Sequence, residues 1–340
     1  MLHEISIQEY YKKAPLLPLI DVRSPGEFQQ GHIVGAVNIP LFTNEERATV
    51  GTVYKQKSKE KAIALGYEYV TPKLNYFLEQ SAQIAKAGAI AVHCWRGGMR
   101  SHSFAQHLHD NGFEEVYVIE GGYKAFRNYV LDFFSQEIDL LVLGGFSGSG
   151  KTFILEELKR LGEQVVDLEG MAHHKGSAFG SLGETSQPSS QHFENQLFEY
   201  WRHLDMDRPV WVEDESSRIG CVQIPNVLYA QMRTNPLYFI DIPKQERAKF
   251  LVEEYACFDT NHLAKSISGI EKRLGGQNVK AALEALEAKD YYQVAMITLQ
   301  YYDKAYLKGV ANRDQEMVQR IPLSTVNHIE NAKQILEIVK

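Results

Sequence analysis

Apolar runs alternate with helical spacing through the first 130 residues. Segments 16–23 (LLPLIDVR), 89–94 (AIAVHC) and 115–122 (EVYVIEGG) are short apolar stretches that end in polar or glycine residues, as buried parallel strands do. Residues 74–88 carry apolar positions at helical spacing, and Gly88 suits the end of that helix. Strands that alternate with helices predict a parallel sheet, so we expect an α/β domain over residues 1–130.

A second alternating pattern begins after a boundary near residues 128–138. A new apolar strand at 138–145 leads through a glycine-rich loop into a helix at 152–162, and apolar runs follow at 163–170, 209–215 and 236–243. From about residue 244 the pattern is helical, with tyrosine and leucine spacing typical of helix packing. We therefore expect a second parallel-sheet α/β domain over residues 131–340, with a helical C-terminal part.

Composition restricts the class of protein. The chain has 340 residues, 44% of them apolar and 23% charged, and it contains no apolar run of transmembrane length. The first residues lack the pattern of a secretory signal, and three widely spaced cysteines exclude a disulfide framework and a CxxC metal site. We expect a cytoplasmic protein with no membrane partner and no metal held by a direct protein cluster.

The charge is uneven along the chain, whose net charge is −7. Residues 1–130 carry 14 basic and 13 acidic side chains, whereas residues 131–340 carry 22 and 30. A polyanionic partner must therefore be held by a local basic patch rather than by the overall charge.

The segment GFSGSGKT, residues 145–152, matches the pattern G-x-x-x-x-G-K-[ST] between a predicted strand and a predicted helix. Its glycines let backbone N–H groups face an anion, the helix adds its positive dipole end, and Lys151 supplies a charge for terminal phosphates. The Thr152 hydroxyl typically reaches Mg2+. We predict a P-loop NTPase-like domain with a phosphate or diphosphate site at Gly145, Ser147, Gly148, Ser149, Gly150, Lys151 and Thr152. The alternative is a glycine-rich turn that binds nothing, and no adenine-reading motif is evident.

An acid at the end of a neighbouring strand is expected to accompany Mg2+. The run VWVEDE offers Glu213, Asp214 and Glu215, and we take Glu213 and Asp214 as the candidates. Three successive acids are more often a solvated strand end, and Asp167 and Glu169 are weaker candidates. The loop at 171–180, with two histidines and a lysine, contacts phosphate or substrate, or is simply a polar surface loop.

The segment HCWRGGMRS, residues 93–101, places Cys94 between a predicted strand and a predicted helix. Loop N–H groups, the helix N-terminus and the charges of Arg96 and Arg100 all favour a thiolate, and a thiolate in this setting is a nucleophile. Gly97 and Gly98 allow the loop to close around an anion. The alternative is a buried structural cysteine, a common state of this residue type.

Two families have such a cysteine at a strand-to-helix loop. HCWRGGMRS fits the tyrosine-phosphatase pattern of His-Cys, five residues, Arg and Ser or Thr, and it also resembles the active loop of rhodaneses. The flanking segments DVRSPGEFQQGHIVGAVNIP (21–40) and IEGGYKAFR (119–127) resemble rhodanese segments, which favours a rhodanese-like domain over residues 1–130. That resemblance implies a persulfide or similar chalcogen adduct on Cys94. The loop is one residue longer than in common sulfurtransferases.

A rhodanese-like domain followed by a P-loop domain, together with WVEDESSRIG, resembles the tRNA 2-selenouridine synthase family over essentially the whole chain. The resemblance implies replacement of the 2-thio sulfur of a wobble uridine by selenium from selenophosphate, after S-geranylation with geranyl diphosphate. It implies that Cys94 takes the selenium and that the P-loop, with Mg2+, binds the diphosphate. Whether the P-loop binds this donor or a nucleotide stays open. The resemblance also implies a partner enzyme that supplies selenophosphate.

The tRNA that this resemblance implies needs a basic surface. The run YKQKSKEK holds four lysines, Lys55, Lys57, Lys59 and Lys61, which either contact tRNA or form an ordinary solvated surface. Two alternative functions also fit these residues. One is a cysteine-dependent phosphatase or sulfurtransferase fused to a nucleotide-dependent kinase-like domain, and the other is a binding module with a nucleotide switch.

Overall fold

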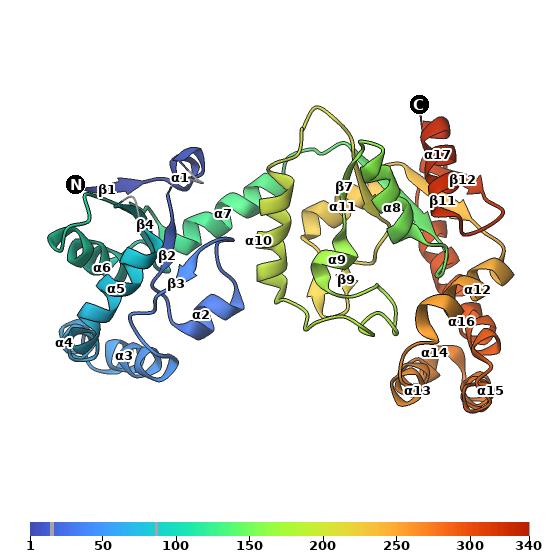
Figure 1. Ribbon diagram of the computed structural model, residues 1–340, viewed down its shortest axis with the longest axis horizontal. Helices are drawn as coiled ribbons and strands as arrows, with labels where there is room; N and C mark the ends of the chain where they lie inside the picture. Colours follow the sequence, from blue (N-terminus) through green and yellow to red (C-terminus); the bar gives the residue numbers. More distant parts are fainter. Residues whose placement is uncertain (14–16, 86–87, 340) are drawn as a thin grey trace. The chain divides into compact units, whose positions relative to one another are not determined.

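The computed structural model describes residues 1–13, 17–85 and 88–339. It divides the chain into two compact units, residues 1–133 and 134–340. The boundary predicted at residues 130 and 131 falls inside α7 (Gly122–Phe134), whereas the units divide at the end of this helix. Both units are parallel α/β structures, and the second carries a helical C-terminal part, as predicted (Figure 1).

The first unit is a five-stranded parallel sheet in the order β1-β5-β4-β2-β3. Its strands are β1 (Leu2–Ile5), β2 (Leu19–Asp21), β3 (Val37–Asn38), β4 (Ala89–His93) and β5 (Glu115–Ile119). Its helices besides α7 are α1 (Ile7–Lys13), α2 (Pro25–Gln30), α3 (Asn44–Gln56), α4 (Lys59–Val70), α5 (Leu74–Ile84) and α6 (Met99–Asp110), with a 3-10 turn at Thr71–Lys73. Strands β1 and β3 did not stand out in the sequence, because neither is a continuous apolar run.

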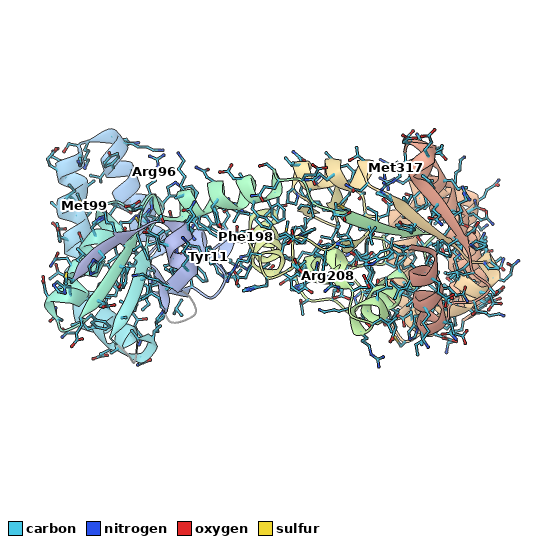
Figure 2. The ribbon with its side chains drawn as sticks, turned by 90° about the horizontal axis from the view of Figure 1, so that it is seen from above. Tyr11, Arg96, Met99, Phe198, Arg208 and Met317 are labelled. Atoms are coloured by element: carbon cyan, nitrogen blue, oxygen red, sulfur yellow. The ribbon has the colours of Figure 1, made fainter. Side chains whose placement is uncertain are left out.

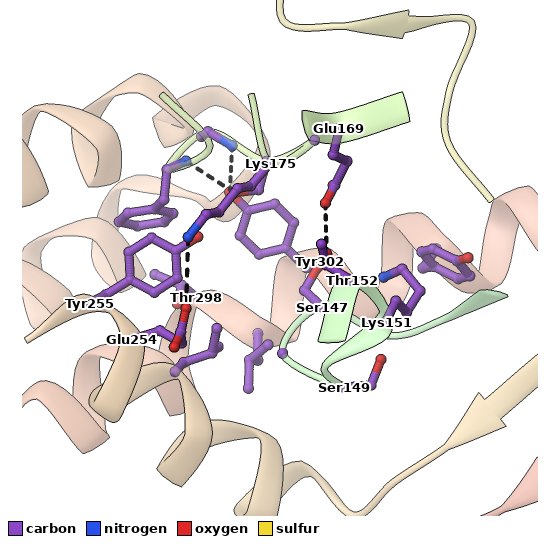
Figure 3. Close-up of a pocket in the computed structure, with 18 of the residues that line it drawn as sticks. Ser147, Ser149, Lys151, Thr152, Glu169, Lys175, Glu254, Tyr255, Thr298 and Tyr302 are labelled. Atoms are coloured by element: carbon purple, nitrogen blue, oxygen red, sulfur yellow. Dashed lines mark hydrogen bonds and ion pairs between the residues drawn. The ribbon is translucent and has the colours of Figure 1, made fainter. Parts of the chain in front are cut away.

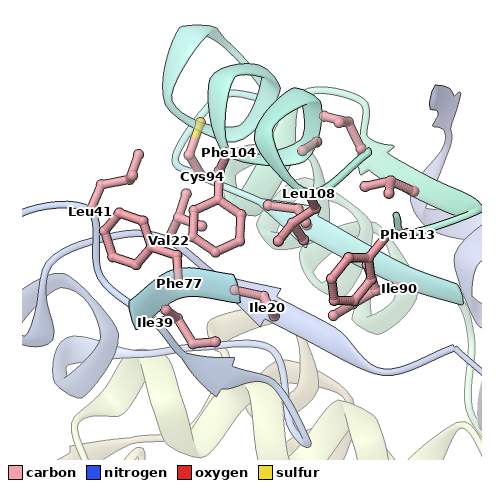
Figure 4. Packing of buried hydrophobic residues seen from close by; sticks show 14 of the residues in the cluster. Ile20, Val22, Ile39, Leu41, Phe77, Ile90, Cys94, Phe104, Leu108 and Phe113 are labelled. Carbon is pink, nitrogen blue, oxygen red and sulfur yellow. The ribbon is translucent and has the colours of Figure 1, made fainter. Parts of the chain in front are cut away.

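Two predicted elements of this unit are shorter than expected. The strand predicted at 16–23 reduces to β2, and residue 16 lies outside the described residues. The helix predicted at 74–88 ends at Ile84, since Ala85 leaves the helical conformation, while residues 86–87 lie outside the described part. The central strands and the facing helices bury Ile20, Val92 and Phe104 in one core, and Cys94 lies at its edge (Figure 4).

The second unit holds a five-stranded parallel sheet in the order β12-β11-β6-β8-β7 and a small antiparallel hairpin. The sheet strands are β6 (Leu140–Gly145), β7 (Gln164–Val166), β8 (Val210–Glu213), β11 (Leu237–Asp241) and β12 (Val318–Pro322), and the hairpin pairs β9 (Arg218–Ile219) with β10 (Val222–Gln223). β12 corrects the expectation of an all-helical end. Its residues are mostly exposed, so it lacks the apolar run that marks a buried strand.

Helices cover this sheet and extend beyond it. They are α8 (Lys151–Arg160), α9 (Leu168–Ala172), α10 (Ser190–Trp201), α11 (Asn226–Thr234), α12 (Lys244–Tyr255) and α17 (His328–Val339). A further group, α13 (Thr260–Gly269), α14 (Glu271–Leu274), α15 (Gly276–Glu287) and α16 (Tyr291–Ala311), packs around its own apolar cluster, which includes Leu263, Ile267 and Leu286. All strands of this sheet are parallel, so the loop that follows β6 lies at the carboxyl edge, where α/β proteins bind ligands.

None of the described helices is both long enough and apolar enough to cross a membrane.

Candidate functional sites

Cys94 follows β4 directly, and α6 begins five residues later with Gly98 as its N-cap. The Cys94 sulfur lies 3.3 Å from the Ser101 hydroxyl and accepts the Gly98 N–H at 3.4 Å. Burial alone raises the pKa of this thiol, but the Ser101 hydroxyl, the Arg100 charge and the N–H groups of Arg96 and Gly98 outweigh it and lower the pKa. The geometry therefore stabilises a thiolate, although only 3% of the residue is exposed.

The two arginines of the loop have different surroundings. Arg100 donates to Glu27 of α2 at 3.0 Å, and Arg47 of α3 lies 3.4 Å from the same carboxyl group. Arg96 is exposed, as is Met99 at the start of α6 (Figure 2). Burial opposes ionisation of Glu27, but Arg100 and the other partners outweigh it and lower its pKa, so Glu27 stays ionised.

The segments that resemble rhodaneses form a buried support under this loop. Arg23 pairs with Asp21 at 2.6 Å, and its guanidinium carbon lies 3.8 Å from the centre of the Tyr123 ring. The Tyr123 N–H in turn donates to the Cys94 carbonyl at 2.8 Å. Gly122 approaches the loop so closely that a Cβ there would overlap the Cys94 carbonyl oxygen. These residues fix the backbone of the Cys94 loop.

The P-loop lies between β6 and α8, as predicted. Gly148 and Gly150 adopt positive φ angles of 78° and 71°, which favour glycine, and Gly150 precedes the first turn of α8. The Lys151 ammonium donates to the Gly145 carbonyl at 3.1 Å, across the loop. The Thr152 hydroxyl donates to Glu169 at 3.2 Å (Figure 3). Ser147 lines the cavity beside the loop, whereas the Ser149 side chain is buried and its hydroxyl donates to the Phe146 carbonyl at 2.6 Å.

The acids named from the sequence are held by other groups. Glu213 is buried and accepts the Leu168 N–H at 3.1 Å, and burial raises its pKa well above the usual range. Asp214 pairs with Arg313 at 2.5 Å and accepts the Tyr306 hydroxyl at 2.8 Å. Glu213 and Asp214 thus already have partners from within the fold.

Glu169 and Glu215, which the sequence ranked lower or left unchosen, lie closer to the P-loop groups. They share a hydrogen bond, and burial together with their neighbouring carboxyls raises the pKa of each, while the Lys151 charge opposes the rise. Gly176 packs directly over them, because a Cβ there would come within 2.6 Å of Glu169 and 2.7 Å of Glu215. Only the fold brings these two carboxyls together.

A cavity of about 1070 Å³ opens from the P-loop. One end is polar, with Lys151, Thr152, Glu169 and Glu215. The other end is formed by α12, α13, α15 and α16 and is mostly apolar, with Leu251, Leu263, Ile270, Leu286, Val294, Ala295 and Leu299. Tyr302 borders it, and burial raises the pKa of this phenol to about 12, so it stays neutral. The tyrosine-rich helices therefore line a cavity as well as packing.

The segment 173–186 forms a loop that closes on itself and borders the cavity. At its base, the His173 ring contacts the Ser186 carbonyl at 3.1 Å and the Thr185 hydroxyl at 2.9 Å. At its middle, the Ala178 N–H donates to the Tyr302 hydroxyl at 3.1 Å, and the Lys175 ammonium lies 3.7 Å from Glu254 of α12 (Figure 3). We call residues 173–186 the roof loop.

The four candidate tRNA-binding lysines lie together at the end of α3, the following turn and the start of α4. All four, Lys55, Lys57, Lys59 and Lys61, are exposed. Within the described residues, no group of three or more histidine, cysteine or acidic side chains has the arrangement of a metal cluster.

Each of the two units matches the model of a known protein family. A model described as the rhodanese-like domain matches residues 6–129, and one described as the tRNA 2-selenouridine synthase AAA domain matches residues 138–335. The tRNA 2-selenouridine synthases of Psychromonas ingrahamii and Aeromonas salmonicida are 33% and 35% identical to the chain, each over 89% of its length and over 91% and 90% of theirs. The one of Shewanella sediminis is 38% identical over 76% of this chain and 75% of its own.

Fold, sites and comparisons together define a two-domain protein in which a rhodanese-like domain precedes a P-loop domain of the AAA class. The chain belongs to the tRNA 2-selenouridine synthase family.

Proposed function

We propose that this chain is a transferase that converts 2-thiouridine of tRNA into 2-selenouridine, with geranyl diphosphate and selenophosphate as its other substrates. The observation that carries the proposal is a P-loop that opens into an apolar cavity, in one chain with an activated cysteine loop. A nucleotide needs no such apolar wall, whereas a prenyl diphosphate requires a phosphate site beside an apolar slot. This cavity favours the prenyl donor over the kinase-like alternative.

In the first step, the Lys151 ammonium and the P-loop N–H groups hold the diphosphate, and the apolar wall of α12, α13, α15 and α16 holds the geranyl chain. The thiouridine sulfur attacks C1 of the geranyl group, the C–O bond breaks, and diphosphate leaves. The oxygen donors of Thr152, Glu169 and Glu215 suit Mg2+, and two buried carboxyls beside each other gain from a cation. When bound there, Mg2+ would neutralise charge on the leaving diphosphate.

In the second step, the Cys94 loop binds selenophosphate, an anion that suits its N–H groups, Arg100 and the exposed Arg96. Selenium then replaces the geranylthio group at C2, because an alkylated sulfur leaves more readily than a thiocarbonyl sulfur. The Cys94 loop and the P-loop thus act on the same uridine in succession.

Mass spectrometry of nucleosides tests the proposal. tRNA treated with the protein, geranyl diphosphate and selenophosphate should yield 2-selenouridine. Cys94→Ala should stop at the geranylated nucleoside, and Lys151→Ala should yield neither product from 2-thiouridine. Formation of neither nucleoside by the wild-type protein would refute the proposal, and cysteine-dependent hydrolysis of an aryl phosphate would then favour the phosphatase alternative.

A further inference from the structure

The oxidation level of selenophosphate restricts what Cys94 receives. Its selenium is at the level of selenide and its phosphorus at the level of phosphate. An S–Se adduct on Cys94 with phosphate as the other product would require selenium to lose a pair of electrons, and the proposed reaction contains no oxidant. Attack on phosphorus requires no oxidant, because selenide departs with the bonding pair.

We propose that the Cys94 thiolate attacks the phosphorus of selenophosphate, so that Cys94 carries a phosphoryl group rather than selenium. This inference rests on the proposed function and specifies its second step. The S–P bond forms, the P–Se bond breaks, and hydrogen selenide ion leaves. Water then cleaves the S–P bond, which restores the thiolate and gives phosphate. The selenide adds to C2 of the geranylated uridine, its proton passes to N3, and geranylthiolate leaves and takes a proton from water.

The loop has the parts that phosphoryl transfer to a thiolate needs. Five residues separate Cys94 from Arg100, and Ser101 follows, so the loop meets the cysteine-phosphatase spacing. In the structure the Ser101 hydroxyl lies 3.3 Å from the sulfur, where it stabilises the thiolate before attack and again when it leaves. Arg100 gives one N–H to Glu27 at 3.0 Å, and its guanidinium has further N–H groups for phosphoryl oxygens.

This role also accounts for the length of the loop, one residue more than in common sulfurtransferases. A phosphoryl group on the cysteine carries oxygens that each need a hydrogen-bond donor, and a longer loop supplies one more backbone N–H. Helix α6 is twelve residues long and begins beside Cys94, where its N-cap N–H already bonds to the sulfur. The N–H groups of its first turn have no partner within the helix, so they suit phosphoryl oxygens.

The charge state of Glu27 bears on which leaving groups the loop accepts. An alkoxide or phenoxide leaving group needs a proton donor, and Glu27 is a carboxyl that the structure places at this loop. Arg100 and Arg47 keep it ionised, so it has no proton to give. Hydrogen selenide ion is a weak base and leaves without one. The loop therefore suits selenophosphate, whose leaving group needs no proton from Glu27.

The test uses the full chain with Cys221→Ser and Cys257→Ser, in which Cys94 is the one thiol. The protein is mixed with selenophosphate alone, denatured rapidly, and analysed for phosphorus and selenium by elemental and peptide mass spectrometry, with and without dithiothreitol. We expect phosphorus on Cys94 that resists dithiothreitol, no selenium, and release of selenide without an oxidant. Cys94→Ala should release at least 100-fold less selenide. Ser101→Ala should accumulate the adduct, since thiolate departure then lacks its hydroxyl partner.

Each other outcome has a distinct meaning. Selenium on Cys94 that dithiothreitol removes, without phosphorus, overturns the inference and leaves the proposed function standing. Selenide release in the absence of any phosphoryl adduct, in the wild type and in Ser101→Ala alike, also overturns it. If selenophosphate is not consumed at all, while tRNA is still geranylated, the selenium step of the proposed function itself fails.

Discussion

At the scale of single residues, the reactivity of Cys94 comes from a few contacts that oppose its burial. A thiol in an apolar site is normally a poor nucleophile, because burial disfavours the thiolate. Here the Ser101 hydroxyl, the Arg100 charge and two backbone N–H groups reverse that effect and lower the pKa. The thiolate therefore persists to a lower pH than that of a free cysteine.

Removal of the Ser101 hydroxyl should shift this balance. A hydrogen bond to a charged group contributes about 1.5–3 kcal/mol, so alkylation of Cys94 by iodoacetamide at neutral pH should slow on the order of tenfold in Ser101→Ala. The pH profile should move to higher pH, since the loss destabilises only the thiolate. The Cys221→Ser, Cys257→Ser background isolates the Cys94 signal. An unchanged profile would show that the hydroxyl does not stabilise the thiolate.

Ala295 tests the apolar wall of the cavity. It is 7% exposed and lines the cavity from α16, so Ala295→Leu should intrude into the space of the geranyl chain. Loss of burial for two methylenes, at about 0.8 kcal/mol each, should raise KM for geranyl diphosphate about tenfold and leave inorganic pyrophosphate binding unchanged. Ala311→Leu, exposed on the same helix, is the matched control. An equal loss for pyrophosphate would contradict a prenyl slot.

At the scale of elements, the roof loop connects the acids beside the P-loop with the apolar wall. Its backbone donors are largely used within the loop, since the N–H groups of Lys175 and Gly176 bond to Gly180 and His174. The Lys175 ammonium is therefore the cation that this loop can offer to a ligand. Its pair with Glu254 is long, at 3.7 Å, and partly solvated, so it is weak, about 0–1 kcal/mol.

Separate substitutions of Lys175 and Glu254 distinguish a ligand-binding role of Lys175 from a structural one. If Lys175 exchanges Glu254 for the diphosphate, Lys175→Ala should weaken pyrophosphate binding about tenfold, and Glu254→Gln should strengthen it by removing a competitor. A purely structural pair predicts the same direction for both. Lys249→Ala, which breaks a pair with Glu246 on α12 outside the cavity, serves as control in calorimetry.

The lysines of α3 and α4 belong to the same scale, because a helix end, a turn and a helix start bring them together. Charge reversal of the four lysines to glutamate should weaken tRNA binding. It should also reduce the slope of log binding constant against log salt concentration by about 0.9 for each lost phosphate contact. The four positions are Lys55, Lys57, Lys59 and Lys61. The control reverses four exposed lysines of the second unit, Lys159, Lys249, Lys280 and Lys333. Equal affinities for both variants across a salt series would exclude this surface.

At the scale of the whole molecule, each unit has its own sheet and its own core. Loss of one active loop should therefore leave the other intact. A mixture of the Cys94→Ala and Lys151→Ala proteins should form 2-selenouridine from tRNA, although neither does so alone, because the geranylated tRNA passes between them. Nucleoside analysis measures this, and no product from the mixture would show that the intermediate stays within one chain.

The sequence by itself determined the α/β class of both domains, the position of Cys94 and the P-loop. These features are local, since strand periodicity, glycines that permit positive φ, and a nucleophile beside a helix start all lie within a few consecutive residues. Strand β12 was not predicted, because its edge position leaves it mostly exposed and without an apolar run.

Only the tertiary structure decided which carboxyls lie beside the P-loop and which pair with other groups. Arg313 lies 99 residues from Asp214 yet pairs with it, while Glu169 and Glu215 meet beside Thr152. The apolar cavity likewise requires α12, α13, α15 and α16 to pack together. Such contacts depend on long-range packing, and no local pattern records them. The acidic run 213–215 can therefore be recognised in the sequence, but only the fold determines that each of its three acids has a different partner.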